Sequence, residues 1–268
     1  MSLVDVLAYG LVGIFAGTMS GLLGLGGGII VVPALIYLFQ QNQAIGGTEL
    51  TTHLAVGTSL AVMVFTSESA LRAHLQRSSI LWSVYQRLWP GLVTGTLVGV
   101  LLSDSLPTDW FKTFLGTFLL FVALKMGFAK EPTEEKPLHF PPQGLHHGFC
   151  FLMGCLSALL GIGGATLLIP YLNYCNLPLK KIAPISVLCT MTVAFVGSLL
   201  LIITGFRASD LPPYATGFVY WPAVICIALA SRYFAPIGAK LTYILPVKQL
   251  KYAFLLLVLV TAFNLLMG

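Results

Sequence analysis

Long apolar runs constrain this chain more than any other feature of its sequence. Stretches of about 18 or more apolar residues, enough to cross a bilayer as a helix, recur along the whole chain. Only 9% of the residues are charged, against about 25% in a typical soluble domain, so no soluble core could bury this much apolar surface. A transmembrane β-barrel would instead show alternating segments of about 10 residues. The sequence therefore predicts an all-α polytopic membrane protein.

A cluster of glycines followed by a proline occurs twice in the chain. Residues 21–35 read GLLGLGGGIIVVPAL, and residues 158–172 read ALLGIGGATLLIPYL. Aligned without gaps, the two stretches share seven identities at an offset of 137, about half of the 268 residues. Similarity of this kind indicates an internal structural repeat, as in many secondary transporters.

The long hydrophobic segments divide into two matching halves. A polar, proline-rich linker at 129–146 separates an N-terminal membrane repeat, 1–128, from a C-terminal membrane repeat, 147–268. Each half has a glycine-broken segment followed by three predicted transmembrane helices, which gives eight long hydrophobic segments and up to ten helical elements. The segments are 3–39, 50–71, 81–103 and 109–128 in the first half, and 145–176, 182–204, 216–235 and 248–267 in the second.

Loop charges predict that the two halves have inverted topology. If each glycine-broken segment is a helix hairpin, each half has five elements and the halves are oppositely oriented. Twelve Lys and Arg then lie on one side of the membrane and two on the other, and the positive-inside rule makes the basic side cytoplasmic. The central linker would be cytoplasmic and both termini outside. A single kinked helix in place of each hairpin is the alternative.

The glycine clusters predict a helix break at membrane depth. Each glycine costs a helix about 1 kcal/mol relative to alanine, so the helix should end near Gly24 and restart near Gly28. Lipid cannot satisfy the freed backbone groups, which must face protein or a wet cavity. The positive end of the second helix would point there and favour an anion. The predicted site-lining residues are Gly24, Gly26, Gly27, Gly28, Gly161, Gly163 and Gly164.

Four hydroxyl residues are further candidate ligands. Thr58 and Ser59 lie in the helix that follows the first glycine cluster, and Ser186 lies near the matching place in the second half, 128 residues after Thr58. Thr166 follows Gly164 by two residues. A hydroxyl group inside a bundle can donate to an anion or bond a carbonyl of its own helix, and the sequence leaves both interpretations open.

These motifs resemble those of a known membrane protein family. The glycine cluster at 21–35, AVGTSLAV at 55–62, GIGGATLLIP at 161–170 and APIGAKLTYILPVKQLKYAF at 235–254 are similar to the TauE/SafE, or sulfite exporter, family. The resemblance covers residues 5–267 and implies export of small sulfur-containing anions across the bacterial inner membrane. The chain departs from the pattern at 185–187, which implies unequal half-sites, and at Arg232, where the family more often has small residues.

Few charged residues fall within the apolar runs. Glu68 and Arg72 are four residues apart and are expected to form an interfacial ion pair, with proton coupling by Glu68 as the alternative. Arg232 is expected near the cytoplasmic end of the predicted helix 216–235. His53 is expected at an interfacial helix end or as a proton carrier. The five cysteines show no CxxC spacing and are interpreted as small buried hydrophobes.

The sequence as a whole predicts a secondary transporter, in particular an exporter of small anions such as sulfite or organosulfonates, bound near the bilayer midplane. An anion channel of the same architecture is the alternative, and no enzyme is predicted. We expect no cofactor, metal or nucleic acid, so the partners are the anion and the lipid bilayer. Glycines spaced by four should form packing faces that would permit a homodimer: Gly13, Gly17, Gly21, Gly91, Gly95 and Gly99.

Overall fold

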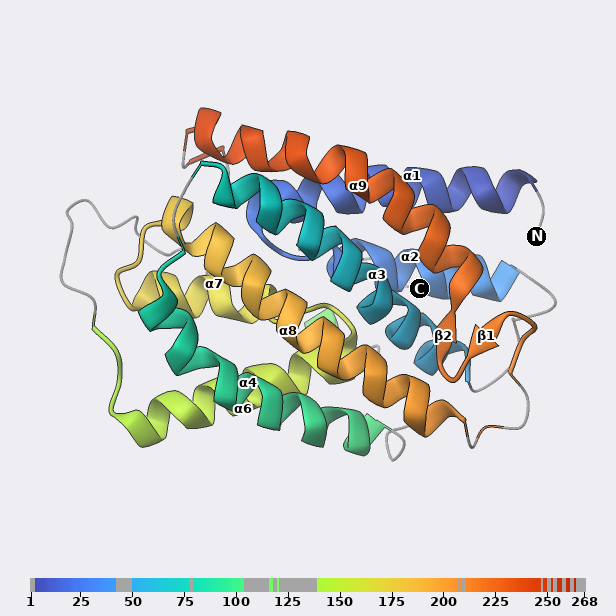
Figure 1. Cartoon of the computed structure of the whole chain (residues 1–268), viewed down its shortest axis with the longest axis horizontal. Coiled ribbons are helices and arrows are strands. Elements are labelled where there is room, and N and C mark those ends of the chain that lie inside the picture. Colours follow the sequence, from blue (N-terminus) through green and yellow to red (C-terminus); the bar gives the residue numbers. More distant parts are fainter. Residues whose placement is uncertain are drawn as a thin grey trace.

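The computed structural model describes residues 3–41, 50–77, 80–103, 139–206, 208 and 211–246, with scattered residues in 116–120 and 248–263. Figure 1 shows a bundle of helices with one short β-ladder at its edge. The elements are α1 (Leu3–Leu23), α2 (Gly28–Gln41), α3 (Thr51–Leu75), α4 (Trp82–Ser103), α6 (Gln143–Leu160), α7 (Ala165–Tyr174), α8 (Leu179–Gly205), β1 (Ala215–Thr216), β2 (Val219–Tyr220) and α9 (Trp221–Ile244).

The predicted membrane class is confirmed. By length and composition, α1, α3, α8 and α9 are each able to cross a bilayer, and α2 is a shorter apolar helix. The predicted helices 109–128 and 248–267 lie outside the described residues, apart from scattered positions. The helical bundle therefore matches an all-α polytopic membrane protein in the part of the chain that the structure describes.

The first glycine cluster reverses the direction of the chain. Gly24, Gly26 and Gly27 have φ angles of 74°, 72° and 84°, in the left-handed region that only glycine adopts freely. After the turn, Gly27 lies beside Ala16, about two turns before the end of α1, so closely that a methyl group on Gly27 would be 3.0 Å from Ala16 Cβ. α1 and α2 therefore form a hairpin, not one kinked helix (Figure 1).

The second glycine cluster does the same between α6 and α7. Gly161 and Gly163 have φ angles of 62° and 75°, close to those of the matching Gly24 and Gly26. Gly164 differs from its counterpart because its φ is −64°. Figure 1 shows α7 running back toward the side from which α6 enters, apart from α6 and next to α8.

The two halves run in opposite directions through the bundle. In Figure 1 α1 enters from the right and α6 from the left, and the same reversal relates α2 to α7, α3 to α8 and α4 to α9. These are the directions that an inverted repeat requires. The inverted repeat itself stays a prediction, because the last predicted helix of each half is not among the described residues.

Glycine faces hold two helix pairs close together, as predicted. Along α1, Gly13, Gly17 and Gly21 touch the α9 backbone at Ile227, Ser231 and Ala235, respectively. Along α4, Gly91, Gly95 and Gly99 touch α6 between His147 and Cys155. Side chains at these positions would collide with the neighbouring backbone, so the glycines set the distance between the helices.

The structure corrects two predicted boundaries in the second half. The helix expected at 216–235 begins at Trp221 and continues to Ile244, because β1 and β2 form an antiparallel ladder just before it. Arg232 is consequently the twelfth of 24 residues in α9, at mid-helix and not near its end. The predicted linker also ends earlier, since α6 begins at Gln143.

Candidate functional site

The two glycine turns meet in the interior of the bundle. All residues of both turns, 24–28 and 161–164, are buried. A methyl group on Gly28 would lie 2.7 Å from the carbonyl oxygen of Gly161, and one on Gly163 would lie 3.5 Å from the carbonyl oxygen of Leu25. The fold thus brings together two sets of predicted site residues that lie 137 positions apart in the chain.

One residue from α3 and one from α8 pack against both turns. A methyl group on Gly26 would lie 2.3 Å from Thr190 Cγ2 and 3.3 Å from Met63 Sδ, and the corresponding distances at Gly163 are 2.7 Å and 3.0 Å. Only a residue without a side chain fits at these two places. Neither Met63 nor Thr190 was predicted as a site residue, because an isolated Met or Thr in an apolar helix carries no distinguishing signal.

The contacts also correct the match between α3 and α8. Gly161 lies against Val56, and the equivalent Gly24 lies against Ala183, an offset of 127 residues and not the predicted 128. At the offset of 127, Ser186 is the counterpart of Ser59, and not of Thr58 as predicted. Met63 and Thr190 are then also counterparts.

Two of the predicted hydroxyl ligands are already engaged by the protein. The Ser59 hydroxyl donates to the carbonyl oxygen of Gly161 at 2.9 Å, which fixes the second turn to α3. Thr58 Oγ1 accepts the backbone N–H of Tyr220 at 3.0 Å, which fixes the β-ladder to α3. Both bonds join separate elements and not groups of the same helix. The Ser59 hydroxyl uses its proton in this bond, whereas Thr58 only accepts and keeps its own O–H as a donor.

Similar bonds hold the first turn to α3 and the second turn to α8. The Thr66 hydroxyl donates to the carbonyl oxygen of Gly26 at 2.9 Å, and Thr190 Oγ1 accepts the backbone N–H of Ala165, the first residue of α7, at 3.1 Å. Sequence reasoning missed both residues. These side-chain bonds add to backbone bonds at the turns, which Gly24 N–H donates to the carbonyl oxygen of Ser20 and Gly161 N–H to that of Ala158.

Five buried hydroxyl groups around the turns have no hydrogen-bond partner among the described residues: Ser20, Ser67, Ser157, Thr166 and Ser186. Thr166 is in the first turn of α7, and Ser186 lies one helical turn from both Ala183 and Thr190, which touch the glycines. Ser67 Oγ is 3.3 Å from where a methyl group on Gly26 would be. Buried polar groups are normally paired, so this cluster is a candidate for binding a polar ligand.

Ser20 and Ser157 could have been found from the sequence. Each precedes the first glycine of its cluster by four residues, so the two serines coincide at the offset of 137. Their position places them in the last turns of α1 and α6, next to the glycine turns. The identity lies one position before the aligned stretches 21–35 and 158–172, so those stretches do not include it.

The surroundings of the turns carry no formal charge. Among the buried described residues, the polar ones are Ser, Thr and two histidines, with no Asp, Glu, Lys or Arg. The electrostatic character therefore comes from the backbone. The first N–H groups of a helix have no partner within that helix, and its N-terminus carries a partial positive charge; α2 and α7 both begin at the turns.

Known membrane proteins are similar to this chain along most of its length. Residues 9–265 match the family described as "Sulfite exporter TauE/SafE". The chain belongs to the TauE/SafE family. A "Probable membrane transporter protein" of Haemophilus influenzae is 30% identical over 95% of both chains. "Probable membrane transporter protein YunE" of Bacillus subtilis is 25% identical over 90% of this chain and 89% of its own length.

A third relative extends the range of organisms. "Probable membrane transporter protein MJ0441" of Methanocaldococcus jannaschii is 28% identical over 90% of this chain and 88% of its own length. No solved structure matches the chain. With this family and these relatives, the TauE/SafE chain is a multi-pass membrane transporter and not an enzyme.

The histidines of this TauE/SafE chain have local partners. The His53 ring lies 5.4 Å from that of Phe218, between ring centroids. His146, at the start of α6, is within hydrogen-bond distance of the Tyr171 hydroxyl, and its Nε2 is 3.2 Å from the carbonyl oxygen of Arg87. His53 and His146 lie away from the glycine turns, whereas Nε2 of the buried His74 is 2.9 Å from the carbonyl oxygen of Gly21, three residues before the first turn.

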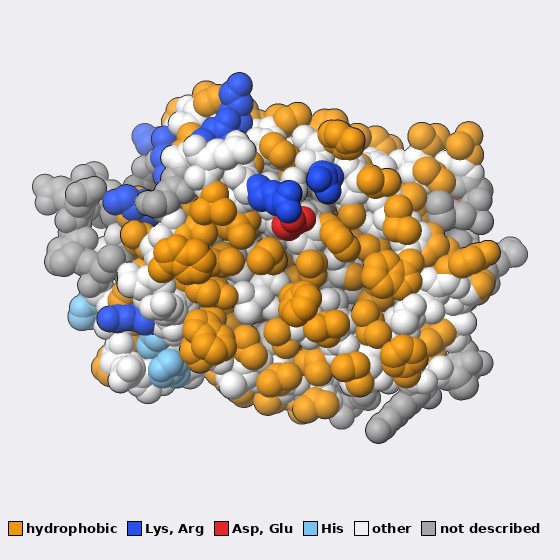
Figure 2. Space-filling model, viewed as in Figure 1, with side chains coloured by type: hydrophobic (Ala, Val, Ile, Leu, Met, Phe, Trp, Pro, Cys, Tyr) orange, Lys and Arg blue, Asp and Glu red, His pale blue; other side chains and the backbone are white. Residues whose placement is uncertain are grey.

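A cavity of about 490 Å³ opens between α3 and α9, away from the glycine turns. Its lining includes Glu68 and Arg72, which form the predicted ion pair, and Arg232. In Figure 2 the acidic and basic side chains of this region stand out on a largely hydrophobic face. The cavity is therefore separate from the candidate anion site.

Proposed function

We propose that this transporter is an exporter of small sulfur-containing anions, such as sulfite or organosulfonates, and that the anion binds where the two glycine turns meet. The observation that carries the proposal is the cluster of unpartnered, buried hydroxyl groups around two helix N-termini. The description of the family as a sulfite exporter supports the substrate class.

The chemistry of the site favours an anion over a cation. Hydroxyl and backbone N–H groups donate hydrogen bonds, and the N-termini of α2 and α7 contribute partial positive charge. No buried carboxylate is present among the described residues to hold a cation or to repel an anion. Donors without a fixed charge would bind an anion weakly enough to release it.

Burial of the site favours a carrier over an open channel. Both glycine turns are closed off from solvent, so an anion reaches them only if the surrounding helices rearrange. Such a rearrangement is the basis of alternating access in secondary transporters. An anion channel of the same architecture remains the second candidate.

Charge distribution supports an orientation in the bacterial inner membrane. Basic residues gather at the end of the bundle where α3 ends and α8 begins, among them Arg77, Lys180 and Lys181. The positive-inside rule makes this end cytoplasmic. The linker would then be cytoplasmic and both termini outside.

Flux measurements in proteoliposomes test the proposal. We expect sulfite or an organosulfonate to cross membranes that contain the protein faster than protein-free membranes. Thiosulfate, sulfate and organic acids, each with and without a pH gradient, would define selectivity and coupling. Equal flux with and without protein for every anion would refute anion transport.

A further inference from the structure

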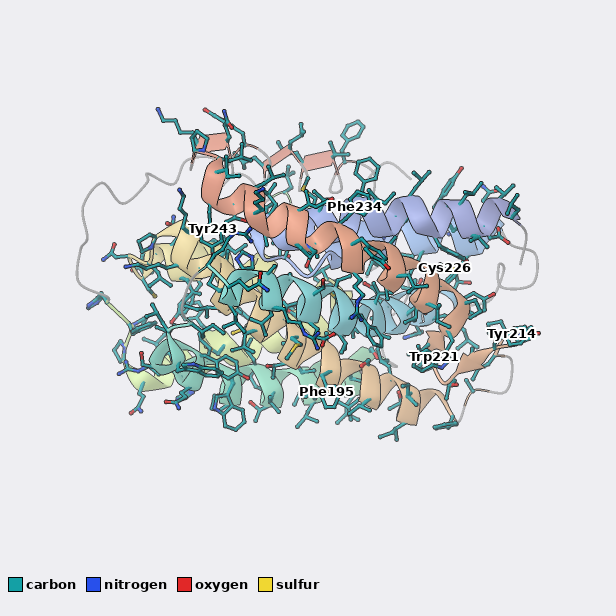
Figure 3. All side chains as sticks on the ribbon, turned by 45° about the horizontal axis from the view of Figure 1, so that its top comes forward. Phe195, Tyr214, Trp221, Cys226, Phe234 and Tyr243 are labelled. Atoms are coloured by element: carbon teal, nitrogen blue, oxygen red, sulfur yellow. The ribbon has the colours of Figure 1, made fainter. Side chains whose placement is uncertain are left out.

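The cavity between α3 and α9 forms a long groove on the outer face of the bundle. On α9 its lining extends from Trp221 to Pro236, a length of roughly 22 Å at 1.5 Å per residue. Figure 3 shows Trp221 at one end of α9 and Tyr243 at the other. The groove thus follows more than half of a helix that is long enough to cross the membrane.

The walls of this groove, called the α3–α9 groove below, combine apolar and basic side chains. Phe65, Val224 and Leu229 belong to the apolar part, whereas Arg72, Gln76 and Arg232 supply hydrogen-bond donors. Figure 2 shows that the surface around the charged group is mostly hydrophobic. This combination fits a molecule with a polar head and an apolar chain.

Arg232 is the unusual member of the α3–α9 groove. It is exposed at the middle of α9, where the surroundings would be hydrocarbon, and an arginine there is costly unless an anion accompanies it. Glu68 is already paired with Arg72. In the part of the chain that the structure describes, Arg232 forms no ion pair.

We propose that the α3–α9 groove binds an anionic phospholipid, with the phosphate at Arg232 and Arg72 and an acyl chain along α9 toward Trp221. Glu68, Arg72 and Arg232 together carry a net charge of +1. A single phosphodiester group, with a charge of −1, would neutralise it. Arg72 lies in the last turn of α3, at the end of the bundle that the positive-inside rule makes cytoplasmic, and anionic lipids of the cytoplasmic leaflet attract such residues.

A second copy of the chain fits the groove less well than a lipid. In a two-fold dimer through this face, Arg232 of each copy would need a carboxylate from the other. Glu68, the only carboxylate among the described residues that line the groove, is engaged with Arg72 in its own chain. Two positively charged grooves would therefore face each other without a counter-ion.

Native mass spectrometry of the purified full chain tests the proposal. The protein is mixed with phosphatidylglycerol or with phosphatidylcholine, and the bound lipid per chain is measured. We expect preferential retention of phosphatidylglycerol, reduced about tenfold or more by Arg232→Gln, since this variant loses the hydrogen bond between the charged guanidinium and the phosphate. Lys240→Gln is the matched control, because Lys240 is an exposed cation of α9 outside the groove.

A second variant tests the apolar part of the groove without changing charge. Ala228 lines the groove, so Ala228→Phe should fill it and also lower lipid retention. Equal retention of the two lipids, equal losses in the Arg232 and Lys240 variants, or displacement by soluble glycerol phosphate would overturn the proposal. So would a wild-type dimer that Arg232→Gln converts to monomers, because a second copy would then cover the groove.

Discussion

At the scale of single residues, Ser59 and Ser186 occupy matching positions but differ in their hydrogen bonds. The Ser59 hydroxyl holds Gly161, whereas the Ser186 hydroxyl is buried and has no partner among the residues that the structure describes. The Ser186 hydroxyl is therefore available to donate a hydrogen bond to a ligand that binds reversibly. The Ser59 hydroxyl instead stabilises the folded structure.

The first prediction compares alanine variants of these two serines. Ser186→Ala should weaken anion binding about tenfold or more, because a hydrogen bond to a charged group contributes about 1.5–3 kcal/mol, and should leave the thermal stability unchanged. Ser59→Ala should lower the stability by about 1 kcal/mol. Concentration-dependent flux and thermal unfolding in detergent measure the two effects.

A buried hydroxyl elsewhere provides the control for this comparison. Thr96 donates to the carbonyl oxygen of Leu92 within α4, so Thr96→Val should not change the anion affinity. If Ser186→Ala transports with wild-type affinity, Ser186 is not a ligand.

The second prediction concerns adjacent glycines of the second turn. Gly163→Ala should destabilise the protein by at least roughly 1–2 kcal/mol, the penalty of a left-handed backbone for residues other than glycine, because its φ is 75° and Thr190 occupies the space. Gly164 has a right-handed φ of −64° and nothing closer than 3.5 Å to an added methyl group. Gly164→Ala should therefore unfold at the wild-type temperature, and equal unfolding temperatures for both variants would contradict the described turn.

At the scale of elements, the third prediction tests the close packing of α1 on α9. Gly17→Leu should destabilise the bundle by about 1–3 kcal/mol, the usual range for overpacking, because its side chain would meet the backbone of Ser231. Gly10→Leu, in the same helix, is the control, since nothing lies within 4 Å of an added methyl group there. Thermal unfolding should separate the two variants, and similar unfolding temperatures would show that α1 and α9 do not touch at Gly17.

Sequence patterns predicted the elements better than their relative register. The distribution of Lys and Arg in the loops predicted the glycine hairpins. With an even number of crossings in each half, these basic residues would be equally frequent on both sides of the membrane, whereas an odd number, with a hairpin in each half, gathers them on one side. The β-ladder was missed, since strands of two residues have no periodicity to detect. The one-residue error in matching Ser186 arose because Thr58 and Ser59 are adjacent hydroxyl residues, and only the contacts of Val56 and Ala183 distinguish them.

At the scale of the whole molecule, a site closed to solvent predicts how transport depends on substrate. An anion held between the turns must be carried by a conformational change, so flux should saturate as its concentration rises. Unlabelled anion inside proteoliposomes should accelerate the uptake of labelled anion, because a loaded carrier returns from the inner side. A current that increases in proportion to concentration, without such exchange, would favour the channel.

The meeting of Gly28 with Gly161 has a consequence for how such a protein could originate. In the proposed site each half supplies one turn and therefore only part of the binding surface, so neither half would bind the anion by itself. A shorter ancestor with a single half would have needed two molecules inserted into the membrane in opposite orientations. Joining them into one polypeptide fixes the stoichiometry and orientation, and leaves each turn free to diverge, as the different backbone angles of Gly27 and Gly164 illustrate.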